Sequence, residues 1–212
     1  MRHPGFAKSA ICALAAVLCM AAGAVPQVEL RANALFERYV ARAPFAGEGG
    51  EGSRIDILIE RWSTDADSRE LSTAFSRKGP DGLLPMLRGI GRPAGVLLIP
   101  GVQGSGARAR LRHPYNLYYA HQVQTPKGRQ IVVATDHFMA FGEPTVNWPS
   151  TFEFSLLDIR FAADGTGIGK VAMGTDLTLN KKTGTIEVSN YAARPARLLE
   201  VRADTGDPTR LK

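Results

Sequence analysis

The sequence has 212 residues, with 26 Lys and Arg against 20 Asp and Glu, and its two cysteines are Cys12 and Cys19. The formal net charge is +6, and it falls to +4 (24 basic against 20 acidic side chains) if a leader containing Arg2 and Lys8 is removed; such a mild charge permits an anionic partner without requiring one. Both cysteines lie in a segment that we expect to be removed. This excludes disulfides, a thiol nucleophile and a cysteine metal site from the mature chain.

The N-terminal segment has the pattern of a secretory signal peptide. Arg2 and Lys8 supply a charged start, residues 10–22 form an apolar run, and Ala22-Gly23-Ala24 is a small-residue cleavage signal. The apolar run is shorter than the roughly 20 residues that span a bilayer, so an uncleaved membrane anchor is the weaker alternative. The sequence predicts a signal peptide over residues 1–24, an exported (periplasmic or extracellular) location, and a single domain over residues 25–212.

The first elements of the mature chain are expected to be two strands. Residues 54–62 alternate charged and apolar side chains, which predicts a half-buried strand. The preceding residues 43–53 contain four glycines and a proline and are typical of a loop. We expect residues 35–43 to form a strand that pairs with 54–62 as a hairpin, although a helical turn also fits this pattern.

The next segment favours helices. Thr64 and Asp67 resemble a capping pair, Leu71 and Phe75 lie on one helical face, and Gly79 is a stop signal, so residues 63–79 are predicted to be a helix. Residues 80–91 are predicted to form a second short helix, broken near Pro85.

The remaining segments predict strands separated by turn residues. Pro126-Lys127-Gly128 is a hairpin turn signal. The expected strands cover residues 95–99, 115–124, 129–138, 151–161, 170–180, 185–191 and 196–202. Helices do not alternate with these strands, as they would in a series of βαβ units. The pattern therefore predicts an α+β fold that is mainly β: an antiparallel meander forming a curved sheet or open barrel with a two-helix insert.

The stretch AGVLLIPGVQGSG (94–106) resembles the loops of two enzyme classes. A hydrolase elbow needs G-x-S-x-G, which is absent, and a phosphate-binding loop needs a following Lys and Ser or Thr, also absent. The Asp-Thr-Gly tripeptide at 204–206 lies too close to the C-terminus to belong to an aspartic protease lobe. These motifs assign no catalytic residue.

The histidines and acids offer limited chemistry. If residue 125 pairs with 129 in the hairpin, His121 and His137 lie on one face about 13 Å apart, too far for a metal unless both rings lean together. A register shifted by one residue places them on opposite faces. We therefore expect no metal and no cofactor, and histidines that are exposed or hydrogen-bonded. Asp136 or Glu143 is a possible general base, although acids at strand ends commonly cap turns.

The row Arg108, Arg110 and Arg112 is the candidate anion-binding feature. On an extended chain the three side chains point the same way and match phosphate, sulfate or carboxylate groups. The competing interpretation is an edge strand protected from aggregation by its charges. Few aromatic residues accompany the row, so nucleic acid is not an expected partner.

Three segments carry a resemblance to a known family: IERWSTDADSRELSTAF, YYAHQVQTPKGRQIVVATDHF and GTIEVSNYAARPARLLEV. Over roughly residues 53–202 the chain resembles a family of uncharacterised secreted bacterial proteins with a signal peptide, an Arg-Trp-Ser-Thr helix entry and an Ala-Thr-Asp strand end. The resemblance implies export and this architecture only, and it assigns no activity to the chain. This chain departs from the family in having His137 in place of Arg and a longer GVQGSGARARLRH loop (101–113).

Two functions from different classes follow as expectations. The first is a non-enzymatic exported binding or accessory protein that recognises a small ligand or an anionic envelope polymer. The alternative is a cofactor-free hydrolase with Asp136 or Glu143 as general base. Composition and motifs favour the binding protein over the enzyme.

Overall fold

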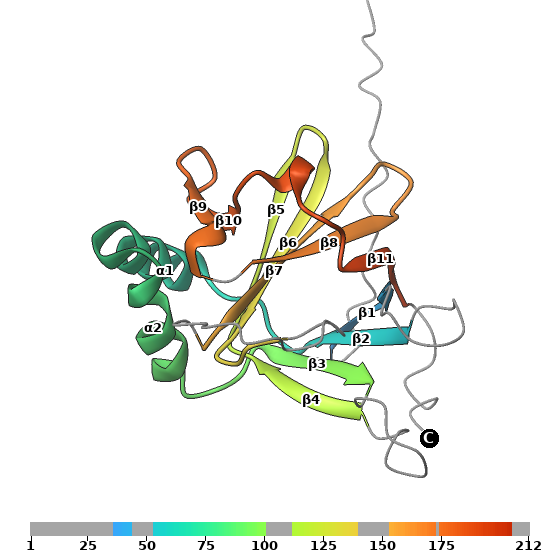
Figure 1. Cartoon of the computed structure of the whole chain (residues 1–212), viewed down its shortest axis with the longest axis horizontal. Coiled ribbons are helices and arrows are strands. Elements are labelled where there is room, and N and C mark those ends of the chain that lie inside the picture. Colours follow the sequence, from blue (N-terminus) through green and yellow to red (C-terminus); the bar gives the residue numbers. More distant parts are fainter. Residues whose placement is uncertain (1–35, 44–52, 101–111, 140–152, 173, 205–212) are drawn as a thin grey trace, which may run out of the picture. The chain divides into compact units, whose positions relative to one another are not determined.

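The computed structural model describes residues 36–43, 53–100, 112–139, 153–172 and 174–204 (Figure 1). The described residues form one compact unit. The expected signal peptide, Glu143 and the tail after Asp204 lie outside the described residues. No helix among the described residues is long and apolar enough to cross a membrane.

Two antiparallel meanders make up most of the described chain. The first consists of β1 (Glu37–Ala43), β2 (Ser53–Ile59), β3 (Gly95–Pro100) and β4 (Arg112–Leu117). The second consists of β5 (Tyr119–Thr125), β6 (Gly128–Thr135), β7 (Ser155–Phe161) and β8 (Gly167–Ala172). The hairpin of β1 with β2 and the hairpin of β5 with β6 are confirmed.

A single strand joins the two meanders. β11 (Leu198–Ala203) pairs with β1 on one side and with β8 on the other, giving a nine-stranded sheet ordered β4-β3-β2-β1-β11-β8-β7-β6-β5 within the described part of the chain. Both pairings shift register within β11, and Glu200 there has φ of 51°. Such a bulge bends a strand, which suits the seam between two meanders.

The other edges of the meanders also meet. Only Tyr118 separates β4 from β5, and its backbone N–H donates to the carbonyl of Ala134 at 2.9 Å. The sheet is therefore strongly curved and nearly closed, which confirms the expected open barrel.

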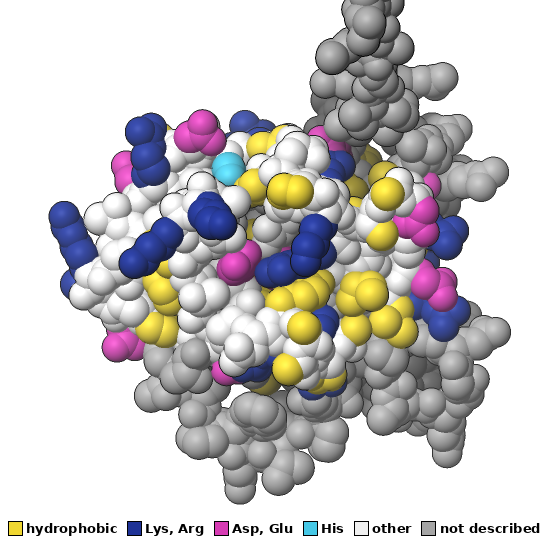
Figure 2. All heavy atoms as spheres, turned by 90° about the horizontal axis from the view of Figure 1, so that it is seen from above, with side chains coloured by type: hydrophobic (Ala, Val, Ile, Leu, Met, Phe, Trp, Pro, Cys, Tyr) yellow, Lys and Arg dark blue, Asp and Glu magenta, His cyan; other side chains and the backbone are white. Residues whose placement is uncertain are grey.

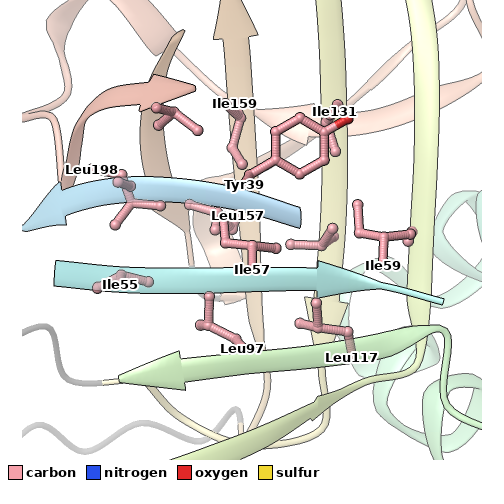
Figure 3. Packing of buried hydrophobic residues seen from close by; sticks show 14 of the residues in the cluster. Tyr39, Ile55, Ile57, Ile59, Leu97, Leu117, Ile131, Leu157, Ile159 and Leu198 are labelled. Carbon is pink, nitrogen blue, oxygen red and sulfur yellow. The ribbon is translucent and has the colours of Figure 1, made fainter. Parts of the chain in front are cut away.

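The core lies between the two meanders. In Figure 3 the strands β1, β2 and β3 cross β6 and β7, and their inward side chains meet between them. The inward positions alternate along each strand, as the period of a pleated strand requires. The larger inward side chains are Tyr39, Ile55, Ile57, Ile59, Leu97, Leu117, Ile131, Leu157, Ile159 and Leu198. All are at most 2% exposed, so they fill the interior of the barrel.

The helical insert covers the outer face of the second meander. It comprises α1 (Asp65–Lys78), a 3₁₀ turn η1 (Gly79–Gly82) and α2 (Leu83–Gly89), and Leu71, Leu83 and Leu87 pack against Val132 and Leu156. The predicted capping pair is confirmed, since Thr64 and Asp67 exchange side chain–backbone hydrogen bonds.

The predicted break near Pro85 was wrong. The irregular turn falls at residues 79–82, and Pro85 lies in the first turn of α2. A proline is tolerated there because the first amide groups of a helix have no intrahelical acceptor.

The strand predicted over residues 170–180 was also wrong. β8 ends at Ala172, a 3₁₀ turn η3 (Gly174–Asp176) follows, and β9 (Leu177–Asn180) pairs with β10 (Thr185–Val188) in a separate two-stranded sheet. A second 3₁₀ turn, η4 (Tyr191–Ala193), leads towards β11. Gly174, with φ of 48°, provides the backbone conformation that breaks the strand.

Candidate functional site

Four side chains gather at the inner face of the sheet and form the Arg129 cluster: Glu37 and Tyr39 of β1, Trp62 after β2, and Arg129 of β6. Glu37 and Tyr39 share the inward face of β1, and Arg129 lies in phase with the buried Ile131 on β6. The Arg129 guanidinium carbon lies 5.6 Å from the ring centroid of Tyr39 and 5.5 Å from that of Trp62. Two aromatic rings thus flank one cation, within the range of cation–π attraction.

Glu37 is the anchor of this cluster. Its Oε2 accepts hydrogen bonds from the Tyr39 hydroxyl at 2.6 Å and from Arg129 Nη2 at 3.2 Å, and its Oε1 accepts one from Trp62 Nε1 at 2.9 Å. The side chains of Glu37 and Arg129 are each 22% exposed. Both oxygens of the Glu37 carboxylate thus accept hydrogen bonds, and the carboxylate fixes the position of the Arg129 guanidinium beside it.

Arg129 retains unused donors. Its Nη2 donates to Glu37, and its buried Nε has no acceptor among the described residues. A guanidinium carries five N–H groups, and a buried donor without a partner costs about 1–3 kcal/mol. The cluster therefore holds a cation that Glu37 fixes in place and whose N–H groups are not all paired with described residues.

Tyr39 acts in this cluster as a neutral donor. Burial raises the pKa of its hydroxyl well above the ordinary value, and its hydrogen bond to Glu37 adds to the rise. The phenol keeps its proton at any physiological pH and continues to donate to Glu37.

The segment after β2 positions Trp62. Arg61 Nη2 donates to the carbonyl of Arg92 at 2.5 Å, and Ser63 exchanges two hydrogen bonds with the backbone of Ala120. Thr64 then begins α1 as its N-cap. Each residue of the Arg-Trp-Ser-Thr entry thus has a structural contact, and together these contacts fix the indole against Glu37 and Arg129.

The sequence reasoning missed this cluster. An arginine in phase with the inward Ile131 and Val133 was a usable signal, and so was an acid in phase with Tyr39. An ion pair that joins β1 to β6 depends on how the two meanders cross, which periodicity does not reveal.

Asp136, a proposed general base, lies just after β6 and pairs with its neighbour. Its Oδ1 lies 2.7 Å from Nδ1 of His137, and its Oδ2 lies 4.0 Å from Nε of Arg88. Arg88 also binds Glu153, 2.6 Å between Nη2 and Oε2. The Asp136 side chain is 13% exposed and that of His137 64%, so the carboxylate orients an imidazole that faces solvent.

The histidine register differs from the one assumed. Thr125 pairs with Gly128 rather than with 129, so His121 lies opposite Val132, on the outer face beside the ring of Tyr119. His137 follows the end of β6. No group of three or more His, Cys, Asp or Glu among the described residues is placed to hold a metal ion.

The predicted arginine row falls mostly outside the described residues. Arg108 and Arg110 lie outside them, and Arg112 begins β4, where its backbone alone is described. β4 is the terminal strand of the nine-stranded sheet, the position assumed by the edge-strand interpretation. Figure 2 shows Lys and Arg spread over one face and interspersed with acidic side chains rather than gathered in one patch.

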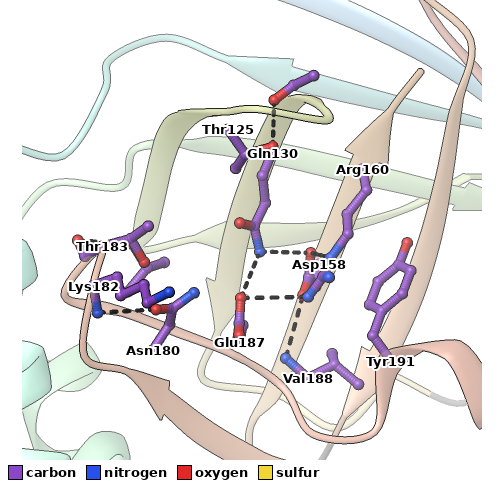
Figure 4. A network of polar contacts seen from close by, with 12 residues as sticks. Thr125, Gln130, Asp158, Arg160, Asn180, Lys182, Thr183, Glu187, Val188 and Tyr191 are labelled. Atoms are coloured by element: carbon purple, nitrogen blue, oxygen red, sulfur yellow. Dashed lines mark hydrogen bonds and ion pairs between the residues drawn. The ribbon is translucent and has the colours of Figure 1, made fainter. Parts of the chain in front are cut away.

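A second polar network lies on the outer face of the second meander (Figure 4). Asp158, which is fully buried, accepts hydrogen bonds from Gln130, from Arg160 and from the backbone of Val188. Arg160 also stacks on Tyr191, 3.8 Å from the ring centroid. The donors of this network reach acceptors on β7 and β10, so it ties the β9–β10 hairpin and η4 to the sheet.

Comparisons with protein-family models, with curated proteins and with solved structures gave no match.

Proposed function

We propose that the chain is a non-enzymatic exported binding protein, and that Arg129 binds the anionic group of a small ligand at the inner face of the open barrel. The observation that carries the proposal is a half-buried guanidinium held by Glu37 and flanked by two rings, while its Nε has no acceptor among the described residues. The predicted signal peptide supplies the export part of the proposal.

Pre-positioning favours binding over a purely structural role. A ligand anion would find a cation whose side-chain entropy is already lost, and the aromatic rings would shield the contact from water. A charge-assisted hydrogen bond contributes about 1.5–3 kcal/mol, which corresponds to about tenfold or more in affinity.

The test is a calorimetric titration of the full mature chain with acetate, D-glucuronate and inorganic phosphate at low salt. We expect at least one of these anions to bind, and Arg129→Gln to weaken binding at least about tenfold. Arg129→Lys keeps the charge but loses the planar fork, so an intermediate loss is expected.

Arg69→Lys, on the exposed face of α1, is the matched control and should bind like wild type. Circular dichroism of each variant shows whether it is folded. Failure of the wild-type protein to bind any of the three anions, or unchanged binding by folded Arg129→Gln, would refute the proposal.

A second candidate function is hydrolysis with His137 as general base. The 2.7 Å contact of its Nδ1 with Asp136 favours it, because this contact leaves the Nε2 of an exposed ring facing solvent. The test is the hydrolysis rate of p-nitrophenyl acetate. His137→Gln and Asp136→Asn should both lower this rate, and His121→Gln should not. Equal rates for all variants would remove this candidate.

A further inference from the structure

Two glutamines extend the Arg129 cluster along the inner face of β5. Gln124 is the register partner of Arg129, and Gln122 is the partner of the buried Ile131. Residues directly opposite in an antiparallel pair share a face, with Cβ atoms about 4.5–5.5 Å apart. Gln124 therefore shares a face with Arg129 directly beside it, and Gln122 lies diagonally from it on the same face.

These glutamines are unusual for an inward position. Both are exposed, although Ala120 on the same face of β5 is fully buried. Among the described residues neither amide makes a hydrogen bond. Two neutral amides and a cation are thus open on one face, next to the half-buried indole of Trp62.

We infer that the ligand of this site is an acidic sugar, with its carboxylate on Arg129 and its hydroxyl groups on Gln122 and Gln124. The inference rests on the proposed function and adds the class of ligand. A guanidinium matches a carboxylate in geometry. An amide both donates and accepts, as a hydroxyl does, so a pair of amides suits a polyhydroxylated ring better than a hydrocarbon chain.

Neighbouring groups argue against other anions. Glu37 lies 3.2 Å from Arg129 Nη2, so a dianion such as phosphate meets a fixed carboxylate next to a single cation. The interior beyond the cluster is filled by Tyr39, Ile57 and Ile131, each at most 1% exposed. A long apolar ligand would therefore find no room inside the barrel, which favours a small polar ligand at its end.

An acidic sugar at this site can be a free sugar acid or one residue of a polyuronate. Gln122 and Gln124 are exposed on a terminal strand of the sheet, so a sugar bound to them can belong to a longer chain. Titration with both D-glucuronate and an oligogalacturonate distinguishes the two sources.

The experiment compares D-glucuronate, D-glucose, acetate and an oligogalacturonate in titrations of the full mature chain. We expect D-glucuronate to bind at least about tenfold more tightly than acetate or D-glucose. The double variant Gln122→Ala/Gln124→Ala should bind D-glucuronate no better than acetate, while acetate binding stays unchanged. His121→Ala, on the outer face of the same strand, should keep the preference for D-glucuronate.

Each outcome decides between the two proposals. Equal affinity for acetate and D-glucuronate would overturn the acidic sugar and leave the anion site of Arg129 standing. No binding of any carboxylate would overturn both. Equal affinity for D-glucose and D-glucuronate would show that the sugar carboxylate does not contact Arg129 and would overturn the acidic sugar, whereas acetate binding that Arg129→Gln weakens would leave the anion site standing. Retention of the D-glucuronate preference by the glutamine double variant would overturn the assignment of its hydroxyl contacts.

Discussion

The burial of Tyr119 makes the free energy of unfolding depend on pH in the alkaline range. Its side chain packs under α1, 2% exposed, and its hydroxyl lies 2.8 Å from that of Ser68. Burial raises the pKa of Tyr119 to about 12, against a smaller lowering effect of the Ser68 hydrogen bond. In the unfolded chain the same phenol has a pKa of about 10. The contribution of protonated Tyr119 to the free energy of unfolding is therefore complete below pH 10, and it is lost as the pH rises towards 12.

Tyr119→Phe should weaken this alkaline loss. Each ionising group with such a shift lowers the free energy of unfolding by about 1.4 kcal/mol per pH unit between the two pKa values, so the variant should lose stability less steeply above pH 10. At pH 8 the variant should be about 1 kcal/mol less stable, because the hydrogen bond with Ser68 is gone. Urea unfolding at pH 8, 10 and 11 measures both effects.

Ser68→Ala is the matched control, because it removes the same hydrogen bond and keeps the ionisable phenol. It should share the loss at pH 8 and keep the alkaline slope of wild type. An identical slope in Tyr119→Phe and wild type would contradict the assignment of this proton to Tyr119.

Only some of the residues of the candidate site could be predicted from the sequence. Asp136 was identified as an acid at a strand end, but its partners His137 and Arg88 belong to a local turn and to α2. Arg129 and Glu37 are 92 positions apart, and nothing in their local patterns links them. Strand phase tells which side chains point inward, but not which inward side chains meet.

Among the elements, Gly95 makes the pairing of β2 with β3 possible. A Cβ at this position would lie 2.0 Å from the carbonyl oxygen of Leu58, a contact that no side chain can sustain without moving the backbone. Gly95 also pairs with Ile59 and Leu117 on its two sides, so this residue of β3 lies between β2 and β4.

Gly95→Ala should therefore be strongly destabilising, by about 3 kcal/mol or more, because relief of the clash disrupts ladder hydrogen bonds. Gly91→Ala, four residues earlier, is the control. No atom lies within 4 Å of its ideal Cβ and its φ is not in the left-handed region, so its effect should stay within about 0.5 kcal/mol. Thermal unfolding of both variants makes the comparison, and equal melting temperatures would contradict the close approach of β2 and β3.

The hairpins and helices were predictable because their signals are local. Thr64, Asp67 and Gly79 bound α1 by capping chemistry that needs no tertiary information. The misread strand at 170–180 shows the limit. Val171 and Leu177 keep the same alternating phase on either side of Gly174, so periodicity does not detect that the chain leaves one sheet for another.

The two meanders are joined at two places. The chain passes from β4 to β5 through a single residue, and β11 hydrogen-bonds to both β1 and β8. The shared core places side chains of both meanders against one another (Figure 3). The sequence predicted the class of fold and most strands, but the crossing of the meanders depends on long-range pairing by the last strand.

Leu198→Ala tests this joining of the two meanders. Leu198 is fully buried in the shared core on β11, and its Cβ would lie 3.0 Å from a Cβ at Gly169 of β8. Its truncation should cost about 2–5 kcal/mol, the range for a leucine in a packed core. Because the seam serves both meanders, hydrogen exchange should accelerate to the same extent in peptides from β2 and from β6. Ile168 lies on the neighbouring strand and is 45% exposed, so Ile168→Ala should change neither the free energy of unfolding nor the hydrogen exchange of β2 and β6. If protection fell in β6 and stayed intact in β2, the meanders would be independent folding units, and β11 would be a strand of the second meander that merely touches the first.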